Sequence, residues 1–394
     1  MILAVSLVAF CAYLGVSWQP PPEPPLATPE ELFQRGLQGI RTRQVMDVRS
    51  ALHGLESNAG SAEQVSLLRG ALSLLTENPQ AALEDFSKLS PDGPLRDPLL
   101  TLTGEALYRV GRLDDAERCL SMAIRQTPDQ VDALRWLATV YYDLGDIDST
   151  LRTLGEVSRV APQDYRPHHM QGAIYRDFGE HQKAITALQR ALELAGQAEV
   201  QREIRPLLAS SQMSLKQYDA AIRTLQEGPA TTTTLALQAD CLWQSGQLDT
   251  AREVLQQAES LGSLPASGQR LKARISIESG QLPEARLWLE SLIASDPGDD
   301  EAEYLLALLF RQLKDETAYQ AHLARSESIK TLKHQLTALS EKAMKEAANA
   351  EVRDQLADLC DQLGLKPLAE VWRTAAASCR RRLPPAVPSQ EANP

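Results

Sequence analysis

The chain has 394 residues, of which 43% are apolar, 5% aromatic and 23% charged. The apolar content excludes a disordered chain, and the small share of aromatic residues argues against β-sandwiches and β-barrels. The net charge of −12 disfavours sequence-independent binding to nucleic acid, so no nucleic-acid partner is expected.

The N-terminal segment 2–18 is apolar and carries no charged residue. At about 1.5 Å per residue in a helix, it is just long enough to cross the hydrocarbon core of a membrane. Residues 1–18 are therefore predicted to be an uncleaved transmembrane anchor, with a cleaved signal peptide or a buried helix as the alternatives. A signal peptide usually has basic residues before its apolar part and a small-residue cleavage motif after it, and both are missing here.

The residues that follow this segment bear on the location of the protein. Glu23, Glu30 and Glu31 favour an extracytoplasmic, periplasmic body, and secretion after signal cleavage is the alternative. Residues 19–28 are predicted to form a stiff Pro-rich spacer. The Pro-rich tail 384–394 is predicted to be disordered.

The body of the chain is built from a sequence repeat of 34 residues. The segments 97–130 and 131–164 align without a gap, and the next 34 residues keep the same register. The aligned positions hold small residues, glycine and proline: Gly104, Ala138 and Gly172; Gly111, Gly145 and Gly179; Pro128 and Pro162. Such self-similarity indicates a repeat architecture.

This pattern resembles that of the tetratricopeptide repeat family, which has small residues at positions 8, 20 and 27 and large apolar ones at positions 4, 11 and 24. The resemblance implies an all-α fold, a right-handed superhelical solenoid of about nine or ten helix-turn-helix repeats over residues 29–383. The expected repeats begin near residues 29, 63, 97, 131, 165, 202, 232, 266, 300 and 350. Small residues such as Gly104 and Ala116 would let the two helices of a repeat approach closely.

Glycine and proline are expected to mark the helix ends. A glycine in the left-handed conformation satisfies carbonyl groups at the end of a helix, and the predicted positions are Gly111, Gly145, Gly179, Gly246 and Gly280. Proline is tolerated in the first turn of a helix because its missing N–H has no partner there. Pro79, Pro283 and Pro367 are expected in the first turn of a second helix.

No catalytic motif accompanies the repeats. The chain has no Gly-rich phosphate loop, no G-x-S-x-G motif and no zinc-ligand spacing among its five cysteines. The neighbouring His168 and His169 lack a metal-binding motif, and the acidic residues are scattered as on a solvated helix surface. We therefore expect no enzymatic activity, no cofactor, no metal and no small-molecule substrate.

The resemblance implies binding of a protein or peptide on the concave face of the solenoid. The predicted function is a non-catalytic, membrane-anchored scaffold, held through residues 1–18, in the assembly of a cell-envelope complex. The alternative is an accessory subunit of an enzyme complex for polysaccharide synthesis, export or secretion.

The resemblance also implies that the first helix of each repeat lines the concave face. The predicted groove residues are Tyr108, Arg135, Tyr142, His169, Arg176, Trp243, Arg270, Arg274 and Arg311. A stripe of arginine and aromatic side chains would suit an acidic partner. The alternative is that these are ordinary solvated helix residues, neutralised by Asp143, Asp177 and Asp240 nearby.

Overall fold

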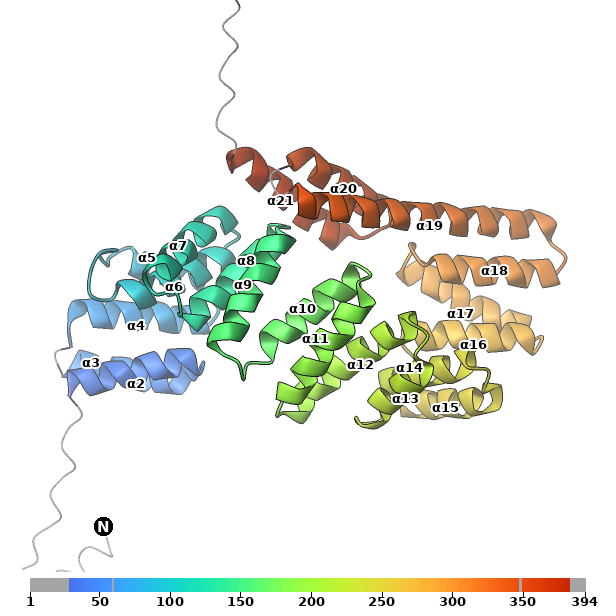
Figure 1. Cartoon of the computed structure of the whole chain (residues 1–394), viewed down its shortest axis with the longest axis horizontal. Helices are drawn as coiled ribbons and strands as arrows, with labels where there is room; N and C mark the ends of the chain where they lie inside the picture. Colours follow the sequence, from blue (N-terminus) through green and yellow to red (C-terminus); the bar gives the residue numbers. More distant parts are fainter. Residues whose placement is uncertain (1–27, 59, 347–348, 383–394) are drawn as a thin grey trace, which may run out of the picture. The chain divides into compact units, whose positions relative to one another are not determined.

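The computed structural model describes residues 28–58, 60–346 and 349–382 (Figure 1). All regular elements in these residues are α-helices, twenty in number, and they follow one another as pairs. The prediction of an all-α repeat solenoid is confirmed. The predicted anchor at 1–18, nearly all of the spacer at 19–28 and the tail at 384–394 lie outside the described residues.

The predicted membrane location needs correction. Among the helices that the structure describes, none combines the length and the apolar character that crossing a membrane requires. The longest, α19 (Glu316–Lys345), has 30 residues but carries lysine, arginine and glutamate along its length. We therefore withdraw the predicted transmembrane helix and the membrane-anchored, periplasmic location, which rest on residues 1–18 and on the acidic residues that follow them.

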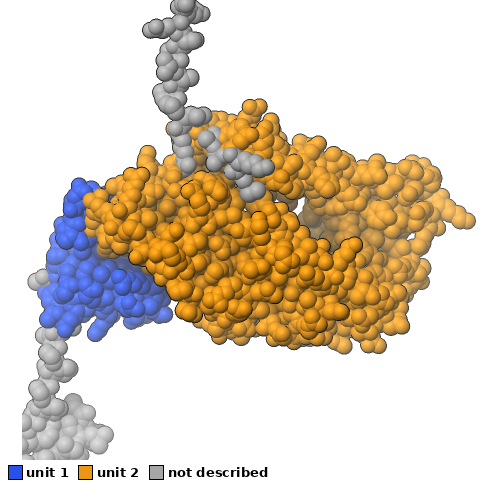
Figure 2. All heavy atoms as spheres, in the orientation of Figure 1, with its two compact units in different colours: residues 1–95 blue, residues 96–394 orange. Residues whose placement is uncertain are grey.

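The chain divides into two compact units (Figure 2), unit 1 (Met1–Leu95) and unit 2 (Arg96–Pro394). The described helices of unit 1 are α2 (Pro29–Arg41), α3 (Val45–Ser57), α4 (Ala62–Leu75) and α5 (Pro79–Phe86). The side chains of Thr28 and Ser61 cap α2 and α4 by accepting a hydrogen bond from the backbone N–H of the third residue of each helix. Local sequence thus fixes where these helices begin.

Unit 2 holds the other helix pairs. Its helices are α6 (Arg96–Arg109), α7 (Leu113–Gln126), α8 (Val131–Asp143), α9 (Ile147–Val160), α10 (Arg166–Asp177), α11 (His181–Leu194), α12 (Ala198–Ser214), α13 (Tyr218–Gln226), α14 (Thr232–Gln244), α15 (Leu248–Leu261), α16 (Ala266–Glu278), α17 (Leu282–Ser295), α18 (Asp300–Gln312), α19, α20 (Ala350–Gln362) and α21 (Lys366–Arg382). In each pair the even-numbered helix is called the first helix and the odd-numbered one the second helix.

Small residues set the distance between the two helices of a pair. A Cβ atom added to Gly104 in α6 would lie 2.5 Å from Cγ of Leu120 in α7. The same distance, 2.5 Å, would separate a Cβ atom on Gly172 in α10 from Cγ of Leu188 in α11. Leu120 and Leu188 are fully buried, so each occupies the space that its glycine leaves free.

The first helices of unit 2 lie on the inner side of its curve. The helix α6 contacts α8, and α10, α12, α14, α16 and α18 form a continuous series of contacts. No two successive second helices make a comparable contact in the part of unit 2 that the structure describes. Since the first helices are closer to one another than the second helices are, they line the inner side of the curve. The side chains of the first helices that point away from the second helices form the inner surface of unit 2.

Candidate binding surface

All nine predicted groove residues lie on first helices of unit 2. Tyr108 is in α6, Arg135 and Tyr142 are in α8, His169 and Arg176 in α10, Trp243 in α14, Arg270 and Arg274 in α16, and Arg311 in α18. Their environments differ, and they fall into three groups: arginines paired with acids, aromatic residues used in packing, and exposed side chains.

The first arginine, Arg135, fastens two repeats together. Its Nη2 and Nε atoms lie 2.7 and 3.0 Å from Oδ2 of Asp164, which precedes α10. Nε of Arg166 lies 2.8 Å from the other oxygen of Asp164, whose side chain is only 6% exposed. Burial alone would raise the pKa of Asp164, but the hydrogen bonds from Arg166 and Arg135 outweigh it and hold the pKa below its ordinary value.

We call such an arginine–acid contact between neighbouring repeats a joint. A second joint connects the repeats of α16 and α18. Nη1 of Arg270 in α16 lies 2.7 Å from Oδ2 of Asp299, whose side chain is 4% exposed. In both joints the acid follows its arginine by 29 residues. Arg274 pairs with Glu301 at the start of α18. These arginines therefore connect neighbouring repeats and are not free charges on the inner surface.

The remaining arginines and the histidine have simpler surroundings. Arg176 pairs with its neighbour Asp177, with Nη2 and Oδ1 2.6 Å apart. Arg311 is exposed and makes no ion pair with any residue that the structure describes. Burial lowers the pKa of His169 in α10, so its imidazole is uncharged near neutral pH.

Two of the predicted aromatic residues take part in packing. The ring of Tyr108 lies 5.3 Å from that of Trp136, centroid to centroid. Burial, followed by the nearby carboxylate of Asp143, raises the pKa of Tyr108 far above its ordinary value, and its hydroxyl donates a hydrogen bond to Asp143. Trp243 is partly buried against the apolar core between α14 and α16.

The exposed aromatic residues are more informative for binding. Among the described residues, the aromatic side chains that are classed as exposed are those of Tyr142 and Tyr304, each 40% exposed. Both belong to first helices, α8 and α18. Tyr304 was not among the predicted groove residues, although it occupies position 5 of the repeat expected at residue 300, the position that also holds Arg135 and Arg270.

The last helix pair of unit 2 packs back against α7 and α8, and we call this contact the seam. Arg353 of α20 is fully buried, and its Nη2 donates to the carbonyl oxygen of Gly145 at 3.3 Å. Trp372 of α21 lies so close to Gly145 that a Cβ atom there would be 2.7 Å from a ring carbon. The hydroxyl of Ser378 and Nε of Arg381 both donate to the carboxylate of Asp114, the latter at 2.9 Å.

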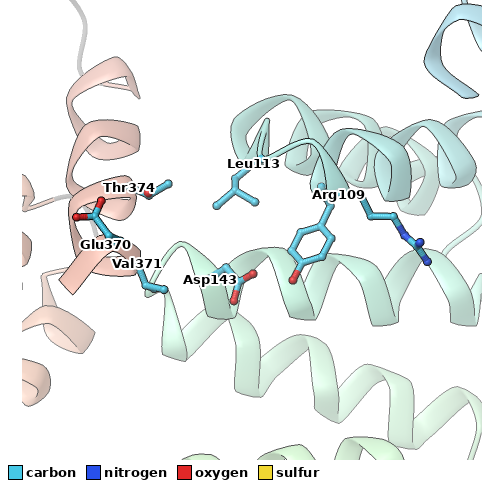
Figure 3. Close-up of a pocket in the computed structure, with 8 residues that line it drawn as sticks. Arg109, Leu113, Asp143, Glu370, Val371 and Thr374 are labelled. Carbon is cyan, nitrogen blue, oxygen red and sulfur yellow. The ribbon is translucent and has the colours of Figure 1, made fainter. Parts of the chain in front are cut away.

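A pocket of about 440 Å³ opens at the seam, and we call it the seam pocket. It is lined by Tyr108, Arg109, Gly111, Leu113, Asp143, Glu370, Val371 and Thr374. Figure 3 shows Glu370, Val371 and Thr374 on α21, facing Leu113 and Asp143 across the opening. The pocket thus joins the inner surface to the last helix of the array.

Most charges at the seam pocket have a partner of opposite sign. Nη2 of Arg109 lies 2.8 Å from Glu105, and Glu370 lies 2.6 Å from Nη1 of Arg373. Asp143 has the hydroxyl of Tyr108 but no basic partner among the described residues. Burial raises the pKa of Asp143, and the hydrogen bond from Tyr108 only partly offsets this effect.

Among the described residues, no three histidine, cysteine, aspartate or glutamate side chains are close enough together to hold one metal ion. The side chains at the seam pocket are suited instead to hydrogen bonds, ion pairs and apolar contact.

Comparison with known proteins supports the resemblance to the tetratricopeptide repeat family in parts of unit 2. Tetratricopeptide repeat profiles match residues 101–151, 165–197 and 242–309. No curated protein matches the chain. All three matches lie within unit 2, and they cover helices that contribute to both the joints and the inner surface.

Solved structures of other proteins match this chain. The apo form of RapI matches 78% of this chain and 98% of its own, with 12% identity and a TM-score of 0.61. A tetratricopeptide repeat protein from Parabacteroides merdae matches 64% of this chain and 100% of its own, with 18% identity and a TM-score of 0.47. The pilF protein of Pseudomonas aeruginosa matches 52% and 95%, with 16% identity and a TM-score of 0.43. At these identities the likeness to RapI concerns the fold alone.

Proposed function

We propose that this tetratricopeptide repeat protein is a non-catalytic scaffold, which binds a protein or peptide partner on the inner surface of unit 2. Helix-pair solenoids commonly mediate protein–protein interactions through an extended inner surface. The inner surface is proposed to bind and not to catalyse, because its described side chains take part in ion pairs and ring packing or are exposed for contact.

The placement of the exposed aromatic side chains supports the proposal most strongly. Tyr142 and Tyr304, each 40% exposed, both lie on first helices of unit 2. Tyrosine is enriched among the residues that dominate binding energies, since it offers a large apolar ring and a hydroxyl. Arg311, exposed and without an ion pair in the described residues, lies on the same helix as Tyr304.

The ion pairs on the inner surface change the expected chemistry of the partner. Arg135, Arg270 and Arg274, three of the five arginines behind the expectation of an acidic partner, are held by acids of neighbouring repeats. Their positive charge is therefore already neutralised within the protein. An acidic partner is therefore not part of the proposed function.

A capture experiment with matched variants tests the proposal. The full chain is immobilised, incubated with extract of the source cells, and the retained proteins are identified by mass spectrometry. The inner-surface variant combines Tyr142→Ala and Tyr304→Ala. The control combines Met122→Ala and Leu287→Ala, which remove exposed apolar side chains, 40% and 70% exposed, from second helices.

The inner-surface variant should lose the captured protein while its melting temperature stays close to that of the wild type, and the control should retain the protein. Loss with the control variant alone would place binding on the second helices and contradict the proposal. The identity of the captured protein separates the two settings expected from the sequence, a cell-envelope assembly and an enzyme complex.

A further inference from the structure

The seam pocket is a built feature of unit 2, because polar and apolar contacts hold its two walls together. Arg353 donates to the carbonyl oxygen of Gly145 just beyond α8. Through Nη1 it also donates to the carbonyl oxygens of Glu346, which follows α19, and Asn349, which caps the start of α20. A guanidinium group is stabilised by the negative ends of two helix dipoles. Trp372 covers Gly145 on the same side.

The walls of the pocket are partly apolar. Leu113 of α7 and Val371 of α21 contribute aliphatic side chains, and Val371 is 41% exposed. The ring of Tyr108 forms a third side of the lining. A ligand with an aliphatic stem would therefore bury apolar surface between these residues.

Asp143 is the carboxylate of the pocket lining that has no cationic partner among the described residues. Asp143 is half-buried and is hydrogen-bonded by the hydroxyl of Tyr108, while Arg109 and Glu370 have partners of their own. A partly desolvated carboxylate without a cation is costly, and a basic ligand would offset that cost. The net charge of −12 would also attract a basic partner at long range.

We propose that the seam pocket binds a basic side chain, lysine or arginine, of the partner segment that lies on the inner surface. The aliphatic stem lies between Leu113 and Val371, and the charged end donates to Asp143. Lysine and arginine have this combination of apolar stem and charged head. This inference rests on the proposed function and adds to it the charge of one anchoring residue of the partner.

Methyl NMR with short peptides tests the inference without the natural partner. The probe peptides are acetyl-Gly-Gly-X-Gly-Gly-amide, in which X is lysine, arginine, norleucine or glutamate. They are titrated into the full chain, and the methyl signals of Leu113 and Val371 are followed. Lysine or arginine peptides should shift these signals in a saturable manner, and norleucine and glutamate peptides should not.

Two variants report on the charge. Asp143→Asn keeps a hydrogen-bond acceptor for Tyr108 and should weaken lysine-peptide binding by about tenfold or more, because a charge-assisted hydrogen bond is lost. Val371→Lys places an ammonium group at the pocket wall and should abolish binding by competing for Asp143. The matched control is Leu368→Lys, at a residue of α21 that is 40% exposed and lies outside the pocket lining.

Equal binding of the norleucine and lysine peptides, or unchanged binding in Asp143→Asn and Val371→Lys, would overturn the inference. The proposed function would stand if partner capture still depended on Tyr142 and Tyr304. Loss of capture in the control variant of second helices alone would instead contradict the proposed function, whatever the peptides do.

Discussion

Asp164 and Asp143 are carboxylates of unit 2 in opposite electrostatic surroundings. Asp164, at the joint between the repeats of α8 and α10, is bound by Arg135 and Arg166, and its pKa lies below the ordinary value. Asp143, at the seam, is bound by the hydroxyl of Tyr108, and its pKa lies above the ordinary value. An acid paired with arginine stabilises the fold, whereas an acid without a cation can bind a basic group of a ligand. The two sites therefore predict different consequences of mutation.

The largest effect is expected where the seam closes on a glycine. Gly145 has a φ of +68°, and Gly179, at the same repeat position, has a φ of +73°. Gly179→Ala should lower the free energy of unfolding by about 1–2 kcal/mol, because alanine is strained in the left-handed conformation. Gly145→Ala should cost about 1–2 kcal/mol more, because its Cβ would meet Trp372, whereas no atom lies within 4 Å of a Cβ on Gly179.

Urea unfolding of both glycine variants measures this difference. Hydrogen exchange should also increase in α21 for Gly145→Ala and stay unchanged there for Gly179→Ala. Equal losses of stability with identical exchange in α21 would show that Trp372 does not cover Gly145 in solution.

The joint should be the next most sensitive place. Asp164→Ala removes the acid that Arg135 and Arg166 share. It leaves the partly buried guanidinium of Arg135 and the exposed one of Arg166 with fewer partners, and should lower the free energy of unfolding by about 2–3 kcal/mol. The control is Asp129→Ala, which breaks the exposed pair with Arg159, whose two side chains are 57% and 69% exposed, and should change stability little. Similar effects of both variants in urea unfolding would mean that the joint is no stronger than a surface ion pair.

The sequence was sufficient to predict the helix pairs because the signals for them are local. Gly104 and Leu120 stand in one repeat, and a glycine such as Gly145 ends a first helix as expected. The partners of Arg135 and Arg270 were missed, although both acids follow at the same spacing of 29 residues. That regular spacing is a signal in the sequence that a search for charge pairs between repeats would find.

The seam left no such signal. Arg353 contacts Gly145 across 208 residues, and Arg381 contacts Asp114 across 267 residues. Neither separation is set by a local motif, since the closing of unit 2 depends on the curvature summed over all the intervening helix pairs. The seam pocket therefore could not be predicted before the structure.

The joint and the seam should also respond oppositely to pH. The folded pKa of Asp164 is below 3.8, so its contribution to stability is present above pH 3.8 and is lost as the pH falls through the folded pKa. The folded pKa of Asp143 is above 3.8, so its ionisation reduces stability above that pKa, and the reduction disappears as the pH falls to 3.8.

Thermal unfolding of two variants between pH 3 and pH 7 checks this contrast. Asp143→Asn should melt at the wild-type temperature or slightly above it at pH 7, and the gap should close in acid. Asp164→Ala should melt below the wild type at pH 7 and approach it in acid. Loss of stability in Asp143→Asn at pH 7 would show that ionised Asp143 stabilises the fold, as the paired acids do.

The smallest effect is expected for the exposed charges of the seam. Arg381 pairs with Asp114 across the seam, and Arg380 pairs with Asp354 inside the last helix pair; the two side chains are 63% and 56% exposed. Arg381→Glu should speed hydrogen exchange of α21 by about threefold, in keeping with a weak surface pair. Arg380→Glu should leave hydrogen exchange of α21 unchanged. Equal exchange rates in the two variants would show that the pair of Arg381 with Asp114 does not hold the seam closed.

Unit 2 carries paired acids at its joints and, at its seam, an acid without a cation among the described residues. Carbon-13 NMR of aspartate-labelled full chain, with the carboxyl signals assigned through Asp143→Asn and Asp164→Ala, measures both pKa values directly. We expect a pKa above 3.8 for Asp143 and a pKa below 3.8 for Asp164. Titration of both carboxyls at the same pH, or in the reverse order, would contradict it.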